Sequence, residues 1–497
     1  MKKLHLYSQA YFIIFALLVL TSCNAQTNSN AENSDKSIDQ IKIAKIDEII
    51  NLYFENAGFN GSALIAHNGK VIYKKGFGLA NMEWNIPNET DTKFRIASVT
   101  KPFTAILIMQ LVAEKKLALH EPITTYLKDY PKENGNKITV HHLLTHSSGL
   151  LRDVDIDQKQ FHSPKQLVEK FKNEPLIYKP GEKFEYSNAG YILLGYILES
   201  VTNMPYKELL EEQIFEPLNM QNSGYYRHSL LLENRASGYT NNFIDYKNTN
   251  YEDFSNVYSA GSIYSTVEDM YLFDQALESE KLLPKKYINL ILTKYIKADF
   301  EGHYGYGLEL TKKPIGNSKD VIETVGHSGS LPGFCAVYTR IPSTHSAIIL
   351  LDNTGRAYLN AMTTAITGIL NDKPYDLPKK SIAKLLFDKI EQEGINSGIQ
   401  FFNNFKDDVN YYVNEEELNI VSYKFNQSND IENAVAVLKI GISFFPNAFN
   451  LYDSYGEILL KQGDENKAID NYKKSVELNP NNKNGIRVLK ELGIEIK

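Results

Sequence analysis

Three short motifs follow one another along the chain and limit the folds that can bring them together. They are Ser98-Val99-Thr100-Lys101, Tyr186-Ser187-Asn188 and His327-Ser328-Gly329. Together they offer a hydroxyl nucleophile, two candidate bases, an amide and a turn beside a strand, which suffices for acyl transfer through a serine ester. Because the motifs are far apart in the sequence, the fold has to assemble them from separate elements.

The first motif opens a predicted helix. Residues 99–112 form an apolar run, and Pro102 within it is acceptable only in a first helical turn. The helix should therefore begin near Ser98, with the Lys101 amine on the same face and within reach of the hydroxyl. A desolvated lysine can act as the base that a serine nucleophile needs. Taken alone, the motif also fits a serine cap followed by a solvated lysine.

The second motif lies between a turn and a helix. Pro180-Gly181 marks the turn, and an apolar helix is expected over 191–198. Tyr186 has an ordinary pKa near 10, and a nearby cation such as Lys101 is expected to lower it. Asn188 offers both a donor and an acceptor, although serine and asparagine at such positions also serve as ordinary helix caps.

The third motif predicts a hairpin. Residues 325–334 hold His327, Gly329 and Ser330 and precede a strand-like run over 335–341. Glycine lets a backbone approach closely, and N–H groups at a strand edge can form an oxyanion hole. His327 taken alone fits a hydrogen-bonded core histidine equally well.

Over residues 45–370 the chain resembles the serine beta-lactamase and penicillin-binding protein superfamily, in its class C-like branch. The resemblance implies a mixed α/β fold, in which an antiparallel sheet flanked by helices meets an all-helical region at the active site. Besides the three motifs it rests on Phe94–Ser98, Leu143–Leu150 and Ser259–Asp269.

The resemblance also implies roles. Ser98 would be acylated, Lys101 and Tyr186 would share proton transfer with the base left open, and Asn188 would hold the substrate and the lysine. The N–H groups of Ser98 and Ser330 would bind the oxyanion.

One departure bears on the substrate. His327-Ser328-Gly329 stands where beta-lactamases of this kind carry Lys-Thr-Gly or a close variant. A mostly neutral imidazole holds a carboxylate weakly. We therefore expect an exported serine hydrolase acting on a small-molecule or peptide ester or amide, resembling esterases and D-amino-acid-specific peptidases. The alternatives are a D,D-peptidase or weak beta-lactamase, and an inactive domain that presents the C-terminal helices to a partner.

Composition excludes other classes. The 497 residues carry a net charge of −7, which does not suit nucleic-acid binding. His141, His142 and His146 include an i, i+4 pair but lack the glutamate of a zinc protease motif. No metal and no cofactor are expected.

The N-terminus resembles a bacterial lipoprotein signal. Two lysines precede an apolar core over 11–20 that is too short to span a bilayer. Leu20-Thr21-Ser22-Cys23 resembles a lipobox, so we expect a signal peptide over 1–22, a lipidated Cys23 and a flexible tether over 23–44. The protein would then be anchored to a membrane of the cell envelope, facing the periplasm or the surface. A plain secretory signal with an incidental cysteine is the alternative. With Cys23 lipidated, no disulfide is expected.

The hydrolase domain is expected over 45–372, and the chain becomes helical beyond it. Ala434 and Ala468 are 34 residues apart, and so are Pro446 and Pro480. This period resembles tetratricopeptide repeats, which we expect over 415–497 after a helical linker over 373–414. The repeats would bind a protein partner, or they would form a helical cap that stabilises the enzyme.

Overall fold

The computed structural model describes residues 40–355 and 358–495. The expected signal peptide, Cys23 and most of the tether lie outside these residues. Residues 40–57 are helical, so the end of the expected tether already belongs to the domain. The helix is held to the domain by a hydrogen bond, because the Lys42 amine donates to the Leu370 carbonyl at 2.7 Å. Within the described ranges, no helix combines the length and the apolar character needed to cross a membrane.

An eight-stranded antiparallel sheet forms the centre of the domain, in the order β10-β11-β12-β13-β14-β15-β1-β2. Its strands β14, β15 and β1 are almost entirely buried, because helices cover both faces of the sheet. The strands are β1 (Gly61–His67), β2 (Lys70–Phe77), β10 (Ile296–Ala298), β11 (Gly302–Tyr304), β12 (Glu309–Pro314), β13 (Val321–Leu331), β14 (Phe334–Ile341) and β15 (Ser346–Asp352).

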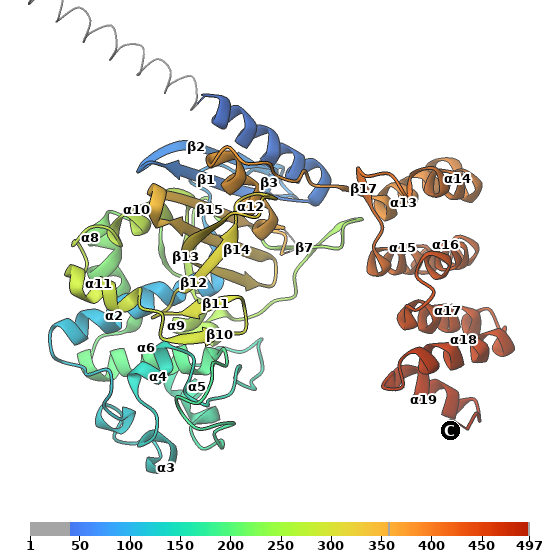
Figure 1. The fold of residues 1–497 in the computed structure, drawn as a ribbon. Coiled ribbons are helices and arrows are strands. Elements are labelled where there is room, and N and C mark those ends of the chain that lie inside the picture. Colours follow the sequence, from blue (N-terminus) through green and yellow to red (C-terminus); the bar gives the residue numbers. More distant parts are fainter. Residues whose placement is uncertain (1–39, 356–357, 496–497) are drawn as a thin grey trace, which may run out of the picture.

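Two apolar cores lie on the two sides of the sheet. The helix of residues 40–57 and α12 (Leu359–Leu370) cover one face. The larger core joins the other face to α2 (Thr100–Ala113), α10 (Val267–Ala276) and an all-helical region. The fold class predicted from the sequence is therefore confirmed (Figure 1).

The remaining elements of this domain are short, apart from α6. The helices are η1 (Ala97–Val99), η2 (Ile123–Thr125), α3 (Lys132–Gly135), α4 (Val140–Leu144), α5 (Pro164–Phe171), α6 (Asn188–Thr202), α7 (Tyr206–Leu210), η3 (Glu211–Phe215), α8 (Glu216–Leu218), η4 (Phe254–Val257), α9 (Tyr258–Gly261), α11 (Lys285–Ile291) and η5 (Pro342–Thr344). The strands are β3 (Leu79–Asn81), β4 (Ile86–Pro87), β5 (Phe94–Arg95), β6 (Gly224–Tyr225), β7 (Tyr239–Asn241), β8 (Tyr246–Asn248) and β9 (Ile263–Ser265).

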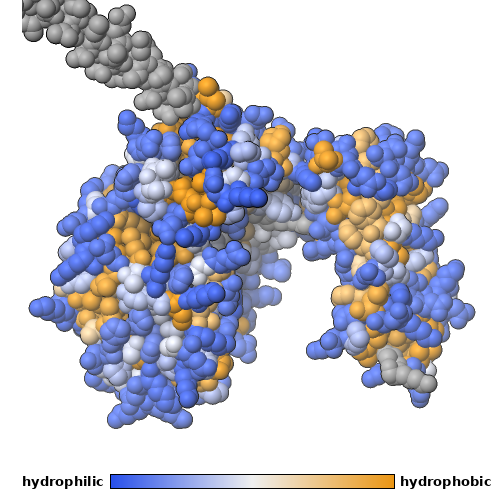
Figure 2. All heavy atoms as spheres, in the orientation of Figure 1, coloured by the Kyte–Doolittle hydropathy of each residue, from blue (hydrophilic) through white to orange (hydrophobic). Residues whose placement is uncertain are grey.

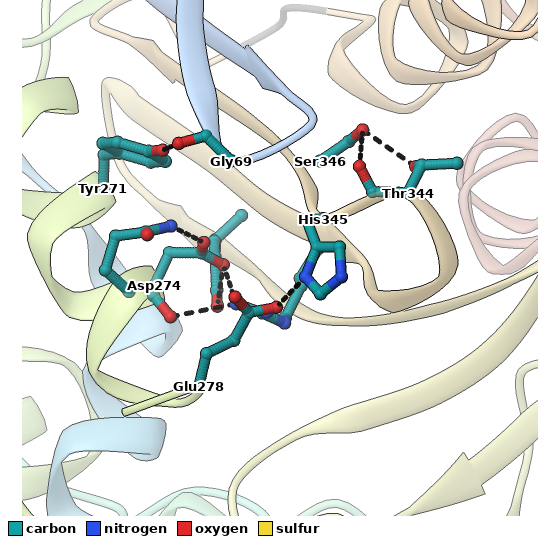
Figure 3. Close-up of polar contacts among 10 residues, drawn as sticks. Gly69, Tyr271, Asp274, Glu278, Thr344, His345 and Ser346 are labelled. Carbon is teal, nitrogen blue, oxygen red and sulfur yellow. Dashed lines mark hydrogen bonds and ion pairs between the residues drawn. The ribbon is translucent and has the colours of Figure 1, made fainter. Parts of the chain in front are cut away.

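A charged cluster attaches α10 to the β14–β15 hairpin. The Arg340 guanidinium pairs with the buried Asp274 carboxylate at 3.0 Å and also with Glu278. Figure 3 shows Asp274, Glu278 and His345 gathered at this junction, where His345 Nδ1 lies 2.8 Å from Glu278 Oε1. The Tyr338 hydroxyl donates to Asp274 at 2.8 Å. The buried carboxylate therefore has its partners within the fold, as buried charges require.

The C-terminal region is helical, as predicted. Glu415 and Phe449 begin α15 and α17, and Ile431 and Glu465 begin α16 and α18, so both pairs of helix starts are 34 residues apart. Figure 2 shows a mostly hydrophilic surface with apolar patches along these helices. Assignment to the tetratricopeptide family stays a prediction. The elements are β16 (Lys380–Ser381), α13 (Ile382–Glu393), α14 (Ile395–Phe405), β17 (Tyr411–Tyr412), α15 (Glu415–Gln427), α16 (Ile431–Phe444), α17 (Phe449–Lys461), α18 (Glu465–Leu478) and α19 (Lys483–Glu491).

The segment predicted as a linker is part of this helical stack. Leu386 of α13 and Phe402 of α14 share one buried core with Leu418 and Leu438 of the next two helices. The helices α13 and α14 therefore act as the additional neighbouring pair that an array of only two repeats needs for stability.

Candidate active site

Ser98 lies on a strained turn between β5 and α2. As the sequence predicts, the helix begins close by, because η1 leads directly into α2 at Thr100. Ala97 has φ +51°, which is uncommon for a residue other than glycine. Gly329 of β13 packs on this turn, where an added Cβ would lie 2.3 Å from the Ile96 carbonyl oxygen. Close packing of β13 against η1 thus fixes the direction of the Ser98 side chain.

Lys101 is completely buried beside the hydroxyl. Its amine lies 3.1 Å from Ser98 Oγ, 2.8 Å from Asn188 Oδ1 and 2.8 Å from the Ala260 carbonyl oxygen. Burial lowers the pKa of Lys101 well below its usual value, while Asp153 opposes this shift and Arg152 adds to it. The alternative of a solvated lysine is excluded for this position.

Tyr186 faces the same pair from the segment that precedes α6. The Lys101 amine lies 4.8 Å from the centre of the Tyr186 ring, and the Tyr186 hydroxyl is hydrogen-bonded to Ser98. Burial raises the pKa of Tyr186, which the bond to Ser98 only partly opposes. The expectation of a lowered tyrosine pKa is therefore wrong, because desolvation outweighs the other influences and favours the neutral phenol.

Asn188 is the first residue of α6 and faces the lysine. Its Oδ1 accepts from Lys101, and its Nδ2 donates to Asp153 Oδ1 at 2.6 Å. Ser187 is the helix cap, and its hydroxyl accepts from the Gly190 N–H at 3.0 Å. Ser187 thus caps the helix, while the neighbouring Asn188 directs its amide toward Lys101.

His327 lies in the predicted hairpin, on β13, and both of its ring nitrogens are engaged. Nδ1 donates to the Ser328 carbonyl at 2.6 Å, so Nε2 accepts from the Tyr304 hydroxyl at 2.9 Å. Burial lowers the pKa of His327 to about 3, with a smaller contribution from Lys101. The ring is therefore a neutral, hydrogen-bonded core group that also borders the cleft.

The predicted site residues meet at one cleft of about 830 Å³. Ser330 is exposed at the far end of β13, opposite Cys335 of β14. Lys101 lies behind the cleft wall, in contact with Ser98 and Asn188. The lining residues are Ser98, Arg152, Phe184, Tyr186, Asn188, Asp299, Phe300, Glu309, His327, Ser328, Gly329, Ser330, Cys335, Val337, Tyr358, Leu359, Asn360 and Ala361.

Charged residues that the sequence analysis did not single out border this cleft. Arg152 is paired with Asp153, with 3.5 Å between Arg152 Nε and Asp153 Oδ2. Glu309 begins β12, and its Oε1 lies 3.4 Å from the Ser328 hydroxyl, while Asp299 is in the β10–β11 turn. Such residues come from loops and strand ends far apart in sequence, so no local pattern marks them.

The three histidines considered for zinc make different hydrogen bonds, although the rings of His141 and His142 lie next to each other. His141 Nδ1 is 2.9 Å from the Tyr306 hydroxyl, and His142 Nδ1 accepts from the Thr139 N–H at 3.2 Å. His146 packs on Tyr186 instead. Across residues 40–355 and 358–495, no group of three or more potential ligands is suitably placed for a metal ion.

This fold and this arrangement of serine, lysine and tyrosine define a serine hydrolase of the beta-lactamase/transpeptidase type. The family model described as Beta-lactamase matches residues 47–368, and the chain belongs to that family. It is 30% identical to the putative penicillin-binding protein PbpX of Bacillus subtilis, a match covering 70% of this chain and 82% of that protein. The sequence-based recognition is confirmed, and the protein is a serine hydrolase.

Two further relatives differ in what their names state. A teichoic acid D-alanine hydrolase of Staphylococcus aureus is 30% identical, over 52% of this chain and 64% of that protein. The solved D-amino acid amidase of Ochrobactrum anthropi, in complex with L-phenylalanine amide, is 27% identical with a TM-score of 0.58. That match covers 68% of this chain and 99% of the amidase chain.

Proposed function

We propose that the protein hydrolyses an ester or amide through an acyl-Ser98 intermediate, with Lys101 as the base. The observation that carries this proposal is the set of contacts around the lysine amine. A neutral amine has two hydrogens, and the Asn188 and Ala260 oxygens accept both. Its lone pair is then left for the Ser98 hydroxyl at 3.1 Å.

The proposed reaction has two stages. Ser98 Oγ attacks the substrate carbonyl and its proton passes to Lys101, while the N–H groups of Ser98 and Ser330 stabilise the oxyanion. The Tyr186 phenol, which its raised pKa keeps protonated, gives its proton to the leaving group and becomes the phenolate. Water then attacks the acyl carbonyl and gives a proton to the Tyr186 phenolate, while protonated Lys101 returns its proton to Ser98 Oγ as that oxygen leaves.

The charge of the cleft favours a substrate that carries an ammonium group. Arg152 is paired with Asp153, whereas Asp299 and Glu309 add carboxyl groups to the lining. Burial raises the pKa of Glu309, and the nearby Lys313 opposes that shift. A neutral His327 supplies no cation for a carboxylate. We therefore favour an aminoacyl ester or amide, in line with the D-alanine and D-amino acid amide hydrolases among the relatives. A carboxylate-bearing beta-lactam or stem peptide would be bound less well.

Three substrates test the proposal. A D-alanyl p-nitrophenyl ester, its N-acetylated form and nitrocefin differ in charge but all report acyl transfer. We expect kcat/KM to decrease in that order, and Glu309→Gln to reduce the preference for the free amine over the acetylated ester. Ser98→Ala should abolish labelling by a fluorescent phosphonate. Labelling of the Ser98→Ala protein would refute the assignment of Ser98 as the nucleophile. Efficient turnover of nitrocefin by the wild-type protein would refute the proposed substrate class.

The location of the enzyme is a separate proposal. The apolar segment and Cys23 support export and lipid anchoring at the cell envelope, and the names of two relatives, a putative penicillin-binding protein and a teichoic acid D-alanine hydrolase, agree with this location. Cys23→Ala should move the processed protein from the membrane to the soluble fraction. A mutant that is processed but still pelleted with membranes would contradict lipidation.

The C-terminal helices support a further function as a protein-binding surface. Their helix starts keep the 34-residue period, and the stack continues beyond the hydrolase domain. We propose that a peptide or protein partner binds these helices. A pull-down that compares the wild-type chain with variants changed at the surface of α15 to α18 would test this. If every variant still retains the partner, the proposal is contradicted.

A further inference from the structure

His146 contacts three consecutive residues centred on Tyr186. The Glu185 N–H donates to the His146 carbonyl at 2.8 Å, and the Ser187 N–H donates to His146 Nδ1 at 3.0 Å. Between these two bonds, the imidazole stacks on the Tyr186 ring with centroids 4.2 Å apart and an interplanar angle of 29°. One residue thus holds the backbone on both sides of the tyrosine and one face of its ring.

The histidine itself is rigidly held. It is 1% exposed, and its φ of +55° fixes an unusual backbone conformation. Phe184, Tyr191 and Tyr304 surround the ring, with centroids 5.8, 4.9 and 4.8 Å away. Close packing around His146 therefore keeps its ring in place against Tyr186.

The protonation state suits this contact. Because Nδ1 accepts a hydrogen bond, the ring proton is on Nε2, which is buried and makes no hydrogen bond among the described residues. Burial lowers the pKa of His146 well below its usual value, and Lys101 lowers it further. The neutral ring therefore keeps an acceptor for Ser187, which phenylalanine could not provide.

We propose that His146 is a positioning residue that holds the Tyr186 hydroxyl against Ser98 during proton transfer. His146 is not among the residues that line the cleft, so it acts through the tyrosine and does not touch the substrate. The proposal rests on the function proposed above for Tyr186. A misplacement of about 1 Å at a reacting group can cost about 100-fold in rate.

Two substitutions of similar shape separate positioning from general stability. His146→Asn keeps an acceptor near the place of Nδ1 and tolerates a positive φ, whereas His146→Leu has no acceptor. We expect His146→Leu to lower kcat by about 100-fold with little change in KM. His146→Asn should recover most of that loss, and both proteins should be compared at a temperature well below their unfolding midpoints.

The same pair is then measured in a Tyr186→Phe background. If His146 acts through the tyrosine hydroxyl, the Asn and Leu variants should have equal kcat there, because the positioned group is gone. A persistent difference in that background, or equal losses in the wild-type background, would overturn the inference. A Tyr186→Phe enzyme as fast as wild type would instead refute the proposed role of Tyr186, so the two failures are distinguishable.

Discussion

At the scale of single residues, the site places two neutral groups side by side. Burial lowers the pKa of Lys101 and raises the pKa of Tyr186, so one can accept a proton while the other can donate one. Lys101→Ala and Tyr186→Phe should each lower kcat by at least about 100-fold, the usual scale of general acid–base catalysis. The double variant should be little worse than either single one, because in the proposed mechanism both residues belong to one proton-transfer unit. Steady-state kinetics on the ester substrate checks this, and additive losses would contradict it.

The buried His327 makes the free energy of unfolding depend on pH. Its folded-state pKa of about 3 is below the ordinary value of 6.5, so the unfolded chain takes up a proton that the folded chain does not. Stability is therefore lost as the pH falls below 6.5. Between pH 6.5 and 5 this one group should cost about 1.6 kcal/mol. Urea unfolding at both pH values should show a smaller acid loss for His327→Gln than for wild type. An identical loss in the two proteins would mean that other groups cause it.

The sequence could predict contacts made along one helix or one hairpin. Ser98 and Lys101 are three residues apart on a helix, which suffices to predict their contact. It could not predict the sign of the Tyr186 pKa shift, because that shift depends on how deeply distant elements bury the ring. The sequence marks His146 only as a possible metal ligand and as part of the stretch Leu143–Leu150, and neither indicates its contact with Tyr186. The Ala260 carbonyl has no side-chain signal.

At the scale of elements, the nucleophile turn depends on its contact with β13. A Cβ on Gly329 would lie 2.3 Å from the Ile96 carbonyl oxygen, so Gly329→Ala has to push the strand away from η1. We expect a fall of about 100-fold in kcat/KM, since the proposed oxyanion donors, the N–H groups of Ser98 and Ser330, flank this contact. Gly190→Ala is the matched control, because its Cβ would meet only ordinary contacts from 3.5 Å outward. Equal activity of the two variants would contradict this account.

The charged cluster between α10 and β14 predicts a large stability effect. The side chains of Arg340 and Asp274 are only 6% and 3% exposed, so Arg340→Met leaves a buried carboxylate without its cation. The expected loss is about 3 to 5 kcal/mol in the free energy of unfolding. Lys294→Met, which breaks the exposed pair with Glu323, should cost no more than about 1 kcal/mol. Urea unfolding measures both, and similar losses would contradict the importance of burial.

At the scale of the whole molecule, the order of the two parts could be predicted but their junction could not. The change from strand to helix patterns near Asp372 and the 34-residue period give the helical region and its helix starts. Part of the contact surface comes from the β7–β8 hairpin, which belongs to the hydrolase domain and contains no repeat signal. Tyr358 adds a hydrogen bond to Tyr412. The apolar residues Phe243 and Ile244 lie in the hairpin, but the sequence does not indicate which part of the chain they contact.

That junction predicts how the two parts unfold. Phe243 and Ile244 at the tip of the hairpin pack against the core of the C-terminal helices, and Asp245 pairs with Lys424 of α15. The stem is tied to the end of β15, since the Tyr239 N–H donates to the Asn353 carbonyl at 2.9 Å.

We expect the wild-type chain to unfold in one calorimetric transition, because the two cores share this apolar contact. Changing both Phe243 and Ile244 to serine should split this transition into two, since the variant loses the apolar burial that these side chains contribute to the junction. Lys424→Ala should keep a single transition, because a pair with both side chains 31% exposed contributes at most about 1 kcal/mol. A double-serine variant that still unfolds in one transition would show that other contacts join the two parts.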